Sequence, residues 1–454
     1  MTATAQARTG DGTPYAARRA LVAGSVGNLI EWYEFGVYGY FATVIAANFF
    51  TPEGAGDLEA LVKTYASFAL AFFFRPVGAA LFGRVGDRIG RRPTLILVVL
   101  LMTAATAAIG LLPTYAAVGA AAPWLLTLVR VVQGLSAGGE FGGAVSVMTE
   151  FAPPGRRGLY GAWQSFTVAL GLLAGAGLAA LLATVLSEDD LHRWGWRLPF
   201  LLAVPLGLVA LWLRLRLEET PSFRRSARGT HRGTGTGEGG GAPAPETAPA
   251  TAPPSAAATG RAVALGIGRL MGWSAAGYTF LVVMPSYLQT TLGASFRQAL
   301  VATVVANAGF ALGILPAGAL SDRIGRRAVM VTGTVLLVLL ALPLLNLLQD
   351  PDASAAAKSA AVFGAGAAVG LLAGPGPAML AEMFPTTVRY TGLGLAYALS
   401  NAVFSGSAGL VVTELIKRTG DADIPAYYVV AVCAVGLPAL LALRGDDHRR
   451  ALRD

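Results

Sequence analysis

Charged residues, cysteine and histidine are scarce in this sequence. Of its 454 residues only 13% are Asp, Glu, Lys or Arg, and the chain has one cysteine and three histidines. A soluble globular domain carries about 25% charged residues, so a soluble fold is excluded. Cys433 alone can form neither a disulfide framework nor a cysteine metal cluster. All three histidines fall outside the predicted helices, so the sequence predicts no metal and no other cofactor.

Long apolar segments are present instead. Hydrophobic residues make up 54% of the chain, and a helix needs about 20 apolar residues to span a bilayer. The segments are continuous rather than alternating, which favours helices over a β-barrel. The sequence predicts an all-α membrane protein with twelve transmembrane helices, at about residues 20–48, 59–82, 94–114, 123–148, 158–184, 197–217, 262–286, 297–319, 328–348, 358–380, 391–413 and 426–444.

The sequence contains the same signatures twice. The hexapeptide Asp-Arg-Ile-Gly-Arg-Arg occurs at 87–92 and again at 322–327. The pattern Glu-x-x-Pro-x-x-x-Arg occurs at 150–157 and again at 382–389, with almost the same separation between its copies. The chain is therefore a duplicated unit that forms two pseudo-symmetric six-helix bundles. Duplicated membrane halves that meet at a midplane site are typical of transporters.

A change of composition separates the two halves. The segment between them is rich in Gly, Pro, Ala and Thr, and it cannot bury enough apolar surface to offset the entropy of ordering. We expect a cytoplasmic tail at 1–19, a six-helix bundle at 20–217, a disordered cytoplasmic linker at 218–260, a second bundle at 261–444 and a cytoplasmic tail at 445–454.

The net charge of +8 is spread over loops that flank the apolar segments. Arginines cluster in the even-numbered connections and the tails, whereas the odd-numbered connections are neutral or acidic. This positive-inside distribution predicts that both termini lie in the cytoplasm and that the partner surface is the lipid bilayer. Nucleic acid is not expected as a partner, because the arginines do not form one basic face. The first apolar segment is too long for a signal-peptide core, so we expect it to remain as a helix.

Ionisable residues inside the apolar segments are candidates for function, since each costs about 2.5–3.5 kcal/mol to place in a bilayer. The second half has no mid-membrane carboxylate, so a proton carrier would have to be a carboxylate of the first half. A carboxylate that faces an arginine in a site open to either side can alternate between charge states. The candidate carboxylates are Glu31, Glu34 and Glu140.

Helical spacing indicates which of these residues lie together. Glu31 lies on one stripe of the first helix with an asparagine and a tyrosine, and Glu34 lies one turn along it. We expect a shared proton and substrate site formed by Asn28, Glu31, Glu34, Tyr38, Arg75, Arg130, Gln133, Glu140 and Arg269. In one alternative the charges are buried ion pairs that only fix helix packing. In another, Arg75 and Arg269 extend to the membrane interface.

The duplicated loops have a mechanical interpretation. Gly90 and Gly325 permit tight turns, and Asp87 and Asp322 can cap a helix or pair with arginine. The alternative is a turn with arginines that only set topology. We expect cytoplasmic gating loops formed by Gly83, Asp87, Arg88, Gly90, Arg91, Arg92, Glu150, Arg157, Asp322, Arg323, Gly325, Arg326, Arg327, Glu382 and Arg389.

Glycine and proline predict details of the helices. Gly134 and Gly138 in the fourth helix, and Gly171 and Gly175 in the fifth, allow neighbouring backbones to approach closely in lipid. The tenth helix contains Gly-Pro-Gly-Pro at 374–377. Two prolines there should break or bend the helix.

Several of these motifs resemble a known family. Residues 83–92 (GRVGDRIGRR) are similar to the signature loop of the major facilitator superfamily, and 130–138 (RVVQGLSAG) to its fourth-helix motif. Residues 27–35 (GNLIEWYEF) resemble the first-helix signature of its metabolite–proton symporters, although Glu34 stands where that family usually has Asp. Further matches lie at 75–78, 138–143, 194–200 and 217–221.

The resemblance implies secondary transport in a bacterial inner membrane by alternating access, with protons and a small metabolite as partners and no obligate protein partner. Residues 284–288 and 425–428 look most like bacterial proline/betaine transporters, which implies an osmolyte substrate. The alternative is a carboxylate such as citrate, 2-oxoglutarate or shikimate. Osmotic activation does not carry over, because the C-terminal coiled coil of some members is absent here.

Three rival functions are less well supported by the sequence. A membrane-embedded enzyme would need a nucleophile with its base, or metal ligands, inside the bilayer. A passive channel would only equilibrate its solute. Drug export is disfavoured because the fifth segment, 158–184, contains no proline, whereas the antiporter motif requires Gly-Pro there.

Overall fold

The structure is a computed structural model of the whole chain. It describes residues 14–51, 57–89, 91–139, 145, 148–149, 152–215, 255–385, 388–445 and 449. These residues are almost entirely helical, and no strand occurs among them. Nine of their helices are long and apolar enough to cross a membrane.

The described elements follow the twelve predicted segments in order. We call the elements before residue 216 the N-terminal half and those from residue 255 onward the C-terminal half. The N-terminal half contains α1 (Pro14–Tyr40), α2 (Ala42–Ile45), η1 (Ala46–Phe50), α3 (Asp57–Ile89), α4 (Arg91–Leu111), α5 (Tyr115–Val118), α6 (Ala121–Ser136), η2 (Ala137–Gly139), α8 (Arg157–Val185), α9 (Glu188–Asp190), η3 (Leu191–Gly195), α10 (Arg197–Leu201) and α11 (Ala203–Leu215).

The C-terminal half repeats this order of long helices. It contains α13 (Ala256–Tyr278), η4 (Thr279–Val283), α14 (Met284–Thr290), α15 (Phe296–Ile324), α16 (Arg326–Gln349), α17 (Ala355–Ala373), α18 (Gly376–Met383), α19 (Arg389–Ser400), η5 (Asn401–Gly406), α20 (Ala408–Thr419) and α21 (Ile424–Leu441).

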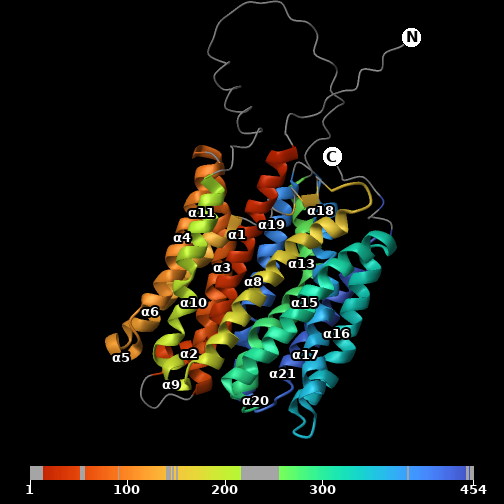
Figure 1. Ribbon diagram of the computed structural model, residues 1–454. Helices are drawn as coiled ribbons and strands as arrows, with labels where there is room; N and C mark the ends of the chain where they lie inside the picture. Colours follow the sequence, from red (N-terminus) through yellow and green to blue (C-terminus); the bar gives the residue numbers. More distant parts are fainter. Residues whose placement is uncertain are drawn as a thin grey trace, which may run out of the picture.

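The two halves lie side by side, with α8 of one packed along α15 of the other (Figure 1). At what we call the upper end, Figure 1 shows α18 and the end of α11; the lower end holds α2, α5, α9 and α20. The other contacts across the interface join α3 to η5, α19 and α20, α8 to α18, and α1 to η4. The interface between the halves is thus lined mainly by α1, α3, α8, α15, α18, η4 and the segment 389–419.

Glycines bring the backbones together, as the sequence predicts. A side chain at Gly134 would overlap the backbone of Ala71, and one at Gly138 would overlap that of Arg75, so α6 packs closely on α3. Gly171 approaches the backbone of Leu29 in the same way, which seats α8 against α1. Close packing of backbones drives helix association in lipid, and it sets the positions of the charged residues described below.

The tenth membrane segment is broken, which confirms the prediction from its prolines. The helix α17 ends at Ala373 and α18 begins at Gly376. Four other segments contain π-helical turns that periodicity did not predict: η1, η3, η4 and η5. Such turns are rare and frequently mark functional sites. In η4 and η5 they fall within the interface between the halves.

Two helix starts and one histidine differ from the expectations. The helix α1 begins at Pro14, inside the range expected to be the cytoplasmic tail. The helix α13 begins at Ala256, inside the range expected to be linker, because Ser255 accepts a hydrogen bond from Ala258 N and three alanines follow. The prediction that no histidine is helical was wrong for His192, which lies in the π-helical turn η3 that leads into α10. The rest of the expected linker, 218–254, lies outside the described residues.

Candidate functional site

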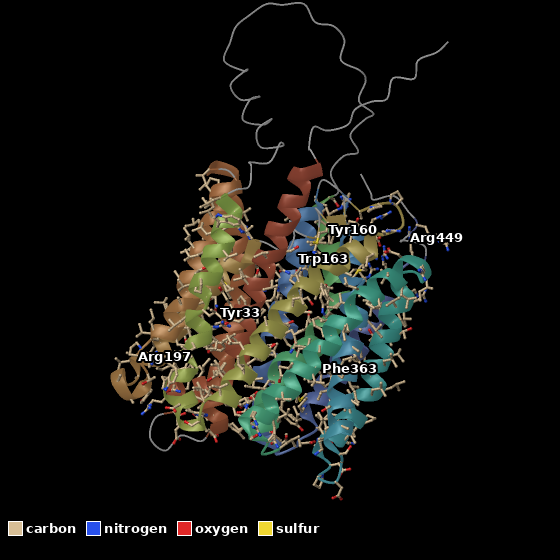
Figure 2. The ribbon with its side chains drawn as sticks, viewed as in Figure 1. Tyr33, Tyr160, Trp163, Arg197, Phe363 and Arg449 are labelled. Atoms are coloured by element: carbon tan, nitrogen blue, oxygen red, sulfur yellow. The ribbon has the colours of Figure 1, made fainter. Side chains whose placement is uncertain are left out.

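A polar stripe on α1 faces the neighbouring helices at mid-height of the bundle. Tyr33 lies within this stripe and is labelled in Figure 2 at about half the height of the bundle. Asn28 donates to Thr167 Oγ1 at 2.7 Å and to Gln164 O at 3.2 Å, which joins α1 to α8. The polar stripe of α1 is therefore packed against another helix rather than exposed to lipid.

Glu31 pairs with Arg75 across the gap between α1 and α3. Its Oε1 lies 3.3 Å from Arg75 Nη2, and both side chains are buried. The alternative in which Arg75 extends to the membrane interface is excluded, because the whole residue is only 4% exposed. A buried ion pair costs desolvation of both charges, so the pair alone adds little net stability.

Glu34 faces a different helix from Glu31. Its Oε2 accepts a hydrogen bond of 2.6 Å from Thr106 of α4, and Thr106 in turn accepts one of 2.8 Å from Gln133 of α6. Gln133 Oε1 accepts from Arg130 Nη1. A continuous polar chain therefore connects Glu34 to Arg130. Oε1 of Glu34 is buried and makes no hydrogen bond.

Arg130 is fully buried against aromatic rings. Its Cζ lies 4.1 Å from the centre of the Tyr38 ring, 4.8 Å from Phe68 and 5.3 Å from Phe35. Among the residues that the structure describes, no carboxylate lies within ion-pair distance of this guanidinium. Its Nε and Nη2 make no hydrogen bond. Donors of a buried cation that lack an acceptor are costly, so Nε and Nη2 are available to an anionic group of a ligand.

A small cavity lies beside the two carboxylates of α1. It has a volume of about 30 Å³ and is lined by Glu31, Glu34, Ser136 and Met102, together with apolar side chains of α4 and α11. A polar cavity of this size can hold a water molecule. It could therefore connect the two carboxylates by a bridging water.

Several buried polar groups around the centre were missed by the sequence reasoning. The amide nitrogen and oxygen of Gln164, Tyr278 Oη, Thr279 Oγ1 and Asn307 Oδ1 are buried and make no hydrogen bond. A neutral polar residue within an apolar segment is not by itself a sign of function. These residues come together only through the way the helices pack in the folded protein. The single signal in the sequence was the proximity of Gln164 to the glycine-rich stretch of the fifth segment.

Two predicted site residues are not placed beside the others. Arg269 is buried and donates from Nε to Ala439 O at 3.1 Å, a contact between α13 and α21. The alternative in which Arg269 extends to the membrane interface is therefore excluded. Glu140 lies outside the described residues. Among the described residues, no group of three His, Cys, Asp or Glu side chains could hold a metal ion.

The second copy of the duplicated loop joins the two halves at the upper end. Gly325 has a φ of 95°, which L side chains rarely adopt, so glycine is required at this turn. Asp322 accepts hydrogen bonds from the backbone nitrogens of Gly158 (2.7 Å) and Leu159 (2.9 Å). An aspartate of the C-terminal half thus caps the start of α8 in the N-terminal half. The spacing of residues in the sequence did not predict that Asp322 would cap a helix of the N-terminal half.

Arginines extend this contact into a network. Arg326 pairs with Asp322 at 2.7 Å and with Glu382 at 3.0 Å, and Arg157 lies 3.5 Å from Glu382. Arg389 donates to the carbonyls of Ala381 and Phe384, both at 3.2 Å. Four chain segments therefore meet through these side chains near the upper end, where Figure 2 labels Tyr160 of α8.

The remaining loop residues contribute less to the described structure. Arg323 and Arg327 are exposed. The predicted residues whose side chains lie outside the described set are Gly83, Asp87, Arg88, Gly90, Arg91, Arg92 and Glu150.

A separate set of hydrogen bonds joins the halves toward the lower end. Tyr65 Oη and Ser286 Oγ are 2.7 Å apart, and Thr43 donates to Gln289 at 3.0 Å. Asn307 donates to Tyr40 Oη at 3.3 Å. The charged cluster is therefore enclosed between two contact layers, one above it and one below it.

Two pseudo-symmetric helical halves around a buried charged site define a membrane transporter of the alternating-access type. The family model of sugar and other transporters matches residues 20–441. The chain belongs to this family, and its fold is that of the major facilitator superfamily, which confirms the fold predicted from sequence.

Individual relatives of this chain are also named. The chain is 34% identical over 432 residues to the proline/betaine transporter of Escherichia coli, with 95% of this chain and 84% of the relative covered. It is 34% identical to the ectoine/proline transporter of Corynebacterium glutamicum, with 97% and 86% covered. The xylose transporter XylE from E. coli, in a partially occluded inward-open conformation, superposes with a TM-score of 0.72 at 16% identity, with 94% of this chain and 97% of that chain covered.

Proposed function

We propose that this chain is a proton symporter of the bacterial inner membrane that takes up a small zwitterionic osmolyte such as proline or glycine betaine. The observation that carries the proposal is the buried cluster of two carboxylates and two arginines, Glu31, Glu34, Arg75 and Arg130. The relatives named for proline, betaine and ectoine supply the substrate class.

The charges of this cluster provide a physical basis for coupling. With both carboxylates ionised, the four side chains sum to zero. A proton on Glu31 neutralises the partner of Arg75, so the four side chains then carry a net positive charge. The carboxylate of a zwitterion that binds in this cluster offsets that charge. Proton and substrate thereby favour each other's binding, which is reciprocal by linkage.

The two contact layers provide the gates. The upper layer contains Asp322, Arg326 and Glu382, and the lower layer contains Tyr65 with Ser286 and Thr43 with Gln289. We place the upper end in the cytoplasm, because the arginine-rich duplicated loops lie there and the positive-inside rule assigns such loops to that side. Each layer must open in turn while the other stays closed.

The protein is proposed to act as a single chain, without a cofactor and without changing its substrate chemically. A carboxylate such as citrate or 2-oxoglutarate is the second candidate substrate. The observation that favours it is the pair of buried arginines, Arg75 and Arg130, which share one aromatic ring.

Uptake into proteoliposomes tests the proposal. The purified full chain is supplied with labelled proline, glycine betaine, citrate, 2-oxoglutarate or shikimate, under an inward proton gradient. We expect accumulation of a zwitterion above equilibrium, because a membrane potential contributes about 2.3 kcal/mol per charge per 100 mV. The label should be recovered unchanged, and a protonophore should abolish accumulation. Uphill uptake that persists with the protonophore and follows sodium would rule out proton symport.

A further inference from the structure

Two guanidinium groups occupy one aromatic enclosure at the centre of the molecule. Arg75 Cζ lies 4.2 Å from the centre of the Phe35 ring and 4.3 Å from that of Phe72. Arg130 Cζ lies 5.3 Å from the same Phe35 ring and closer to Tyr38 and Phe68. Cations within about 6 Å of a ring centre are attracted to its face. The enclosure is thus built to hold positive charge.

The rings come from both halves of the protein. Phe68 and Phe72 of α3 lie 5.2 Å apart, and Tyr278 of α13 meets them at 6.1 and 5.3 Å. Trp32 of α1 lies 6.1 Å from Tyr278. Tyr278 is 6% exposed, its hydroxyl makes no hydrogen bond, and it directly precedes the π-helical turn η4. The enclosure is therefore complete only when α13 of the C-terminal half lies against α3 of the N-terminal half.

We propose that this enclosure, defined by Trp32, Phe35, Phe68, Phe72 and Tyr278, is the subsite for the cationic nitrogen of the substrate. In the substrate-free protein, Arg75 and Arg130 occupy it as internal ligands. The nitrogen of the substrate takes the ring faces that a guanidinium covers, and the substrate carboxylate binds the displaced arginine. This inference rests on the proposed function and specifies how its site recognises a zwitterion.

The two arginines have different roles in this exchange. Arg75 is held by Glu31 at 3.3 Å, whereas Arg130 has no carboxylate partner among the described residues and two donors without hydrogen bonds. Arg130 is therefore the group that receives the substrate carboxylate. A quaternary ammonium cannot donate hydrogen bonds, so ring faces are among the few surfaces that can replace its water. Binding also favours the state in which Tyr278 closes on Phe72, which couples recognition to occlusion.

A ligand series separates charge from shape. The full chain in proteoliposomes exchanges labelled glycine betaine, and unlabelled competitors are added. Glycine betaine is compared with 3,3-dimethylbutanoate, which has the same shape and carboxylate without the positive charge, and with choline, which lacks the carboxylate. We expect 3,3-dimethylbutanoate to compete at least about 30-fold more weakly, the factor that corresponds to the 2 kcal/mol of a desolvated cation–π contact. Choline should also compete more weakly, because it has no carboxylate for Arg130 to bind.

Ring variants locate the effect. Tyr278→Phe keeps the aromatic face and should retain the discrimination between glycine betaine and 3,3-dimethylbutanoate. Tyr278→Leu and Phe72→Leu remove a face and should each reduce it to below about 5-fold. Phe363→Leu removes an exposed ring of α17, labelled in Figure 2, and should leave the discrimination unchanged.

The outcomes distinguish this inference from the proposed function. Proton-driven accumulation of glycine betaine, with equal competition by 3,3-dimethylbutanoate, would overturn the cation subsite and leave symport intact. Retained discrimination in both leucine variants, measured on protein that still exchanges label, would also overturn it. Uptake of a carboxylate with no binding of any zwitterion would overturn both proposals together. If one leucine variant fails to fold, the other variant and the ligand series on the unmodified chain still decide the question.

Discussion

Arg130 and Arg326 are both almost completely buried, yet their surroundings differ. Arg326, at the upper end, contacts two carboxylates and the hydroxyl of Ser321. Arg130, at the centre, contacts three aromatic rings and one glutamine amide. Buried charges that serve a fixed structure are paired and hydrogen-bonded. The comparison indicates that Arg326 belongs to a fixed contact between the two halves. Arg130, by contrast, keeps hydrogen-bond donors that a ligand can use.

The largest expected effects come from exchanging these two arginines for glutamine. Arg130→Gln should reduce accumulation at least about 100-fold, or about 2.8 kcal/mol at 1.4 kcal/mol per tenfold, without lowering the thermal stability of the purified protein. Arg326→Gln should lower stability, because breaking a buried pair leaves Asp322 and Glu382 uncompensated and costs about 3–5 kcal/mol. Uptake and thermal unfolding are measured on the same preparations.

The exposed Arg323 provides the control for this pair, since Arg323→Gln should change neither uptake nor unfolding. Arg130→Lys separates charge from shape, because lysine cannot present the planar fork of arginine. A lysine variant with full transport would contradict the role given to Arg130 as the carboxylate receptor.

The next effect concerns the carboxylates. Glu31→Gln, Glu34→Gln and Glu140→Gln should lose accumulation while they keep much of their substrate exchange, because exchange needs no net release of a proton. The reason is that the C-terminal half has no mid-membrane carboxylate in the sequence to substitute for them. Counterflow of labelled substrate is compared with proton-driven uptake at equal protein in the membrane. Wild-type accumulation in all three variants would show that these acids only fix packing.

A smaller effect is expected at the duplicated loops. Asp322→Asn weakens the cap on α8 and the pair with Arg326, so the inward-open state should gain population. Transport should slow, with substrate affinity altered by less than tenfold, about 1.4 kcal/mol. Labelling of single cysteines placed along the inner cavity measures the shift.

Asp87→Asn is the matched variant in the first copy of the loop, where we expect the same direction of change. Normal transport with unchanged labelling in both variants would reduce these aspartates to turn residues.

The smallest effect is expected at Arg269, which bonds to a backbone carbonyl of α21. Arg269→Gln should alter the maximal uptake rate by less than about threefold, since a hydrogen bond of this kind contributes about 1 kcal/mol to stability. A loss of substrate binding comparable to that of Arg130→Gln would place Arg269 in the central site after all.

The sequence was sufficient to predict the fold but not the pairing within the site. Apolar segments, the duplication and the prolines at 374–377 identified the helices, their two halves and the broken segment. Helical spacing placed Glu31 and Glu34 together, yet it could not show that they face α3 and α4 respectively. That depends on how each helix is rotated against its neighbours, which glycine contacts determine in three dimensions.

The aromatic enclosure was hidden for a related reason. Aromatic residues such as Phe68, Phe72 and Tyr278 are common at both lipid-facing and core positions of membrane helices. Nothing in their spacing indicates that they lie beside an arginine. The capping of α8 by Asp322, which joins the two halves, could not be predicted from the sequence either. The Asp322 carboxylate accepts hydrogen bonds from backbone nitrogens, and these carry no sequence signal.

The contact between Asp322 and the backbone of residues 158 and 159 also has a genetic consequence. Every amino acid except proline offers the same N–H, so the hydrogen bond from residue 159 does not depend on which side chain stands there. Residue 158 must remain glycine for a different reason, because a side chain there would meet Gly318 O at 2.5 Å. Variation that tunes the balance of states must therefore accumulate on the other side, at codon 322 and its charged neighbours.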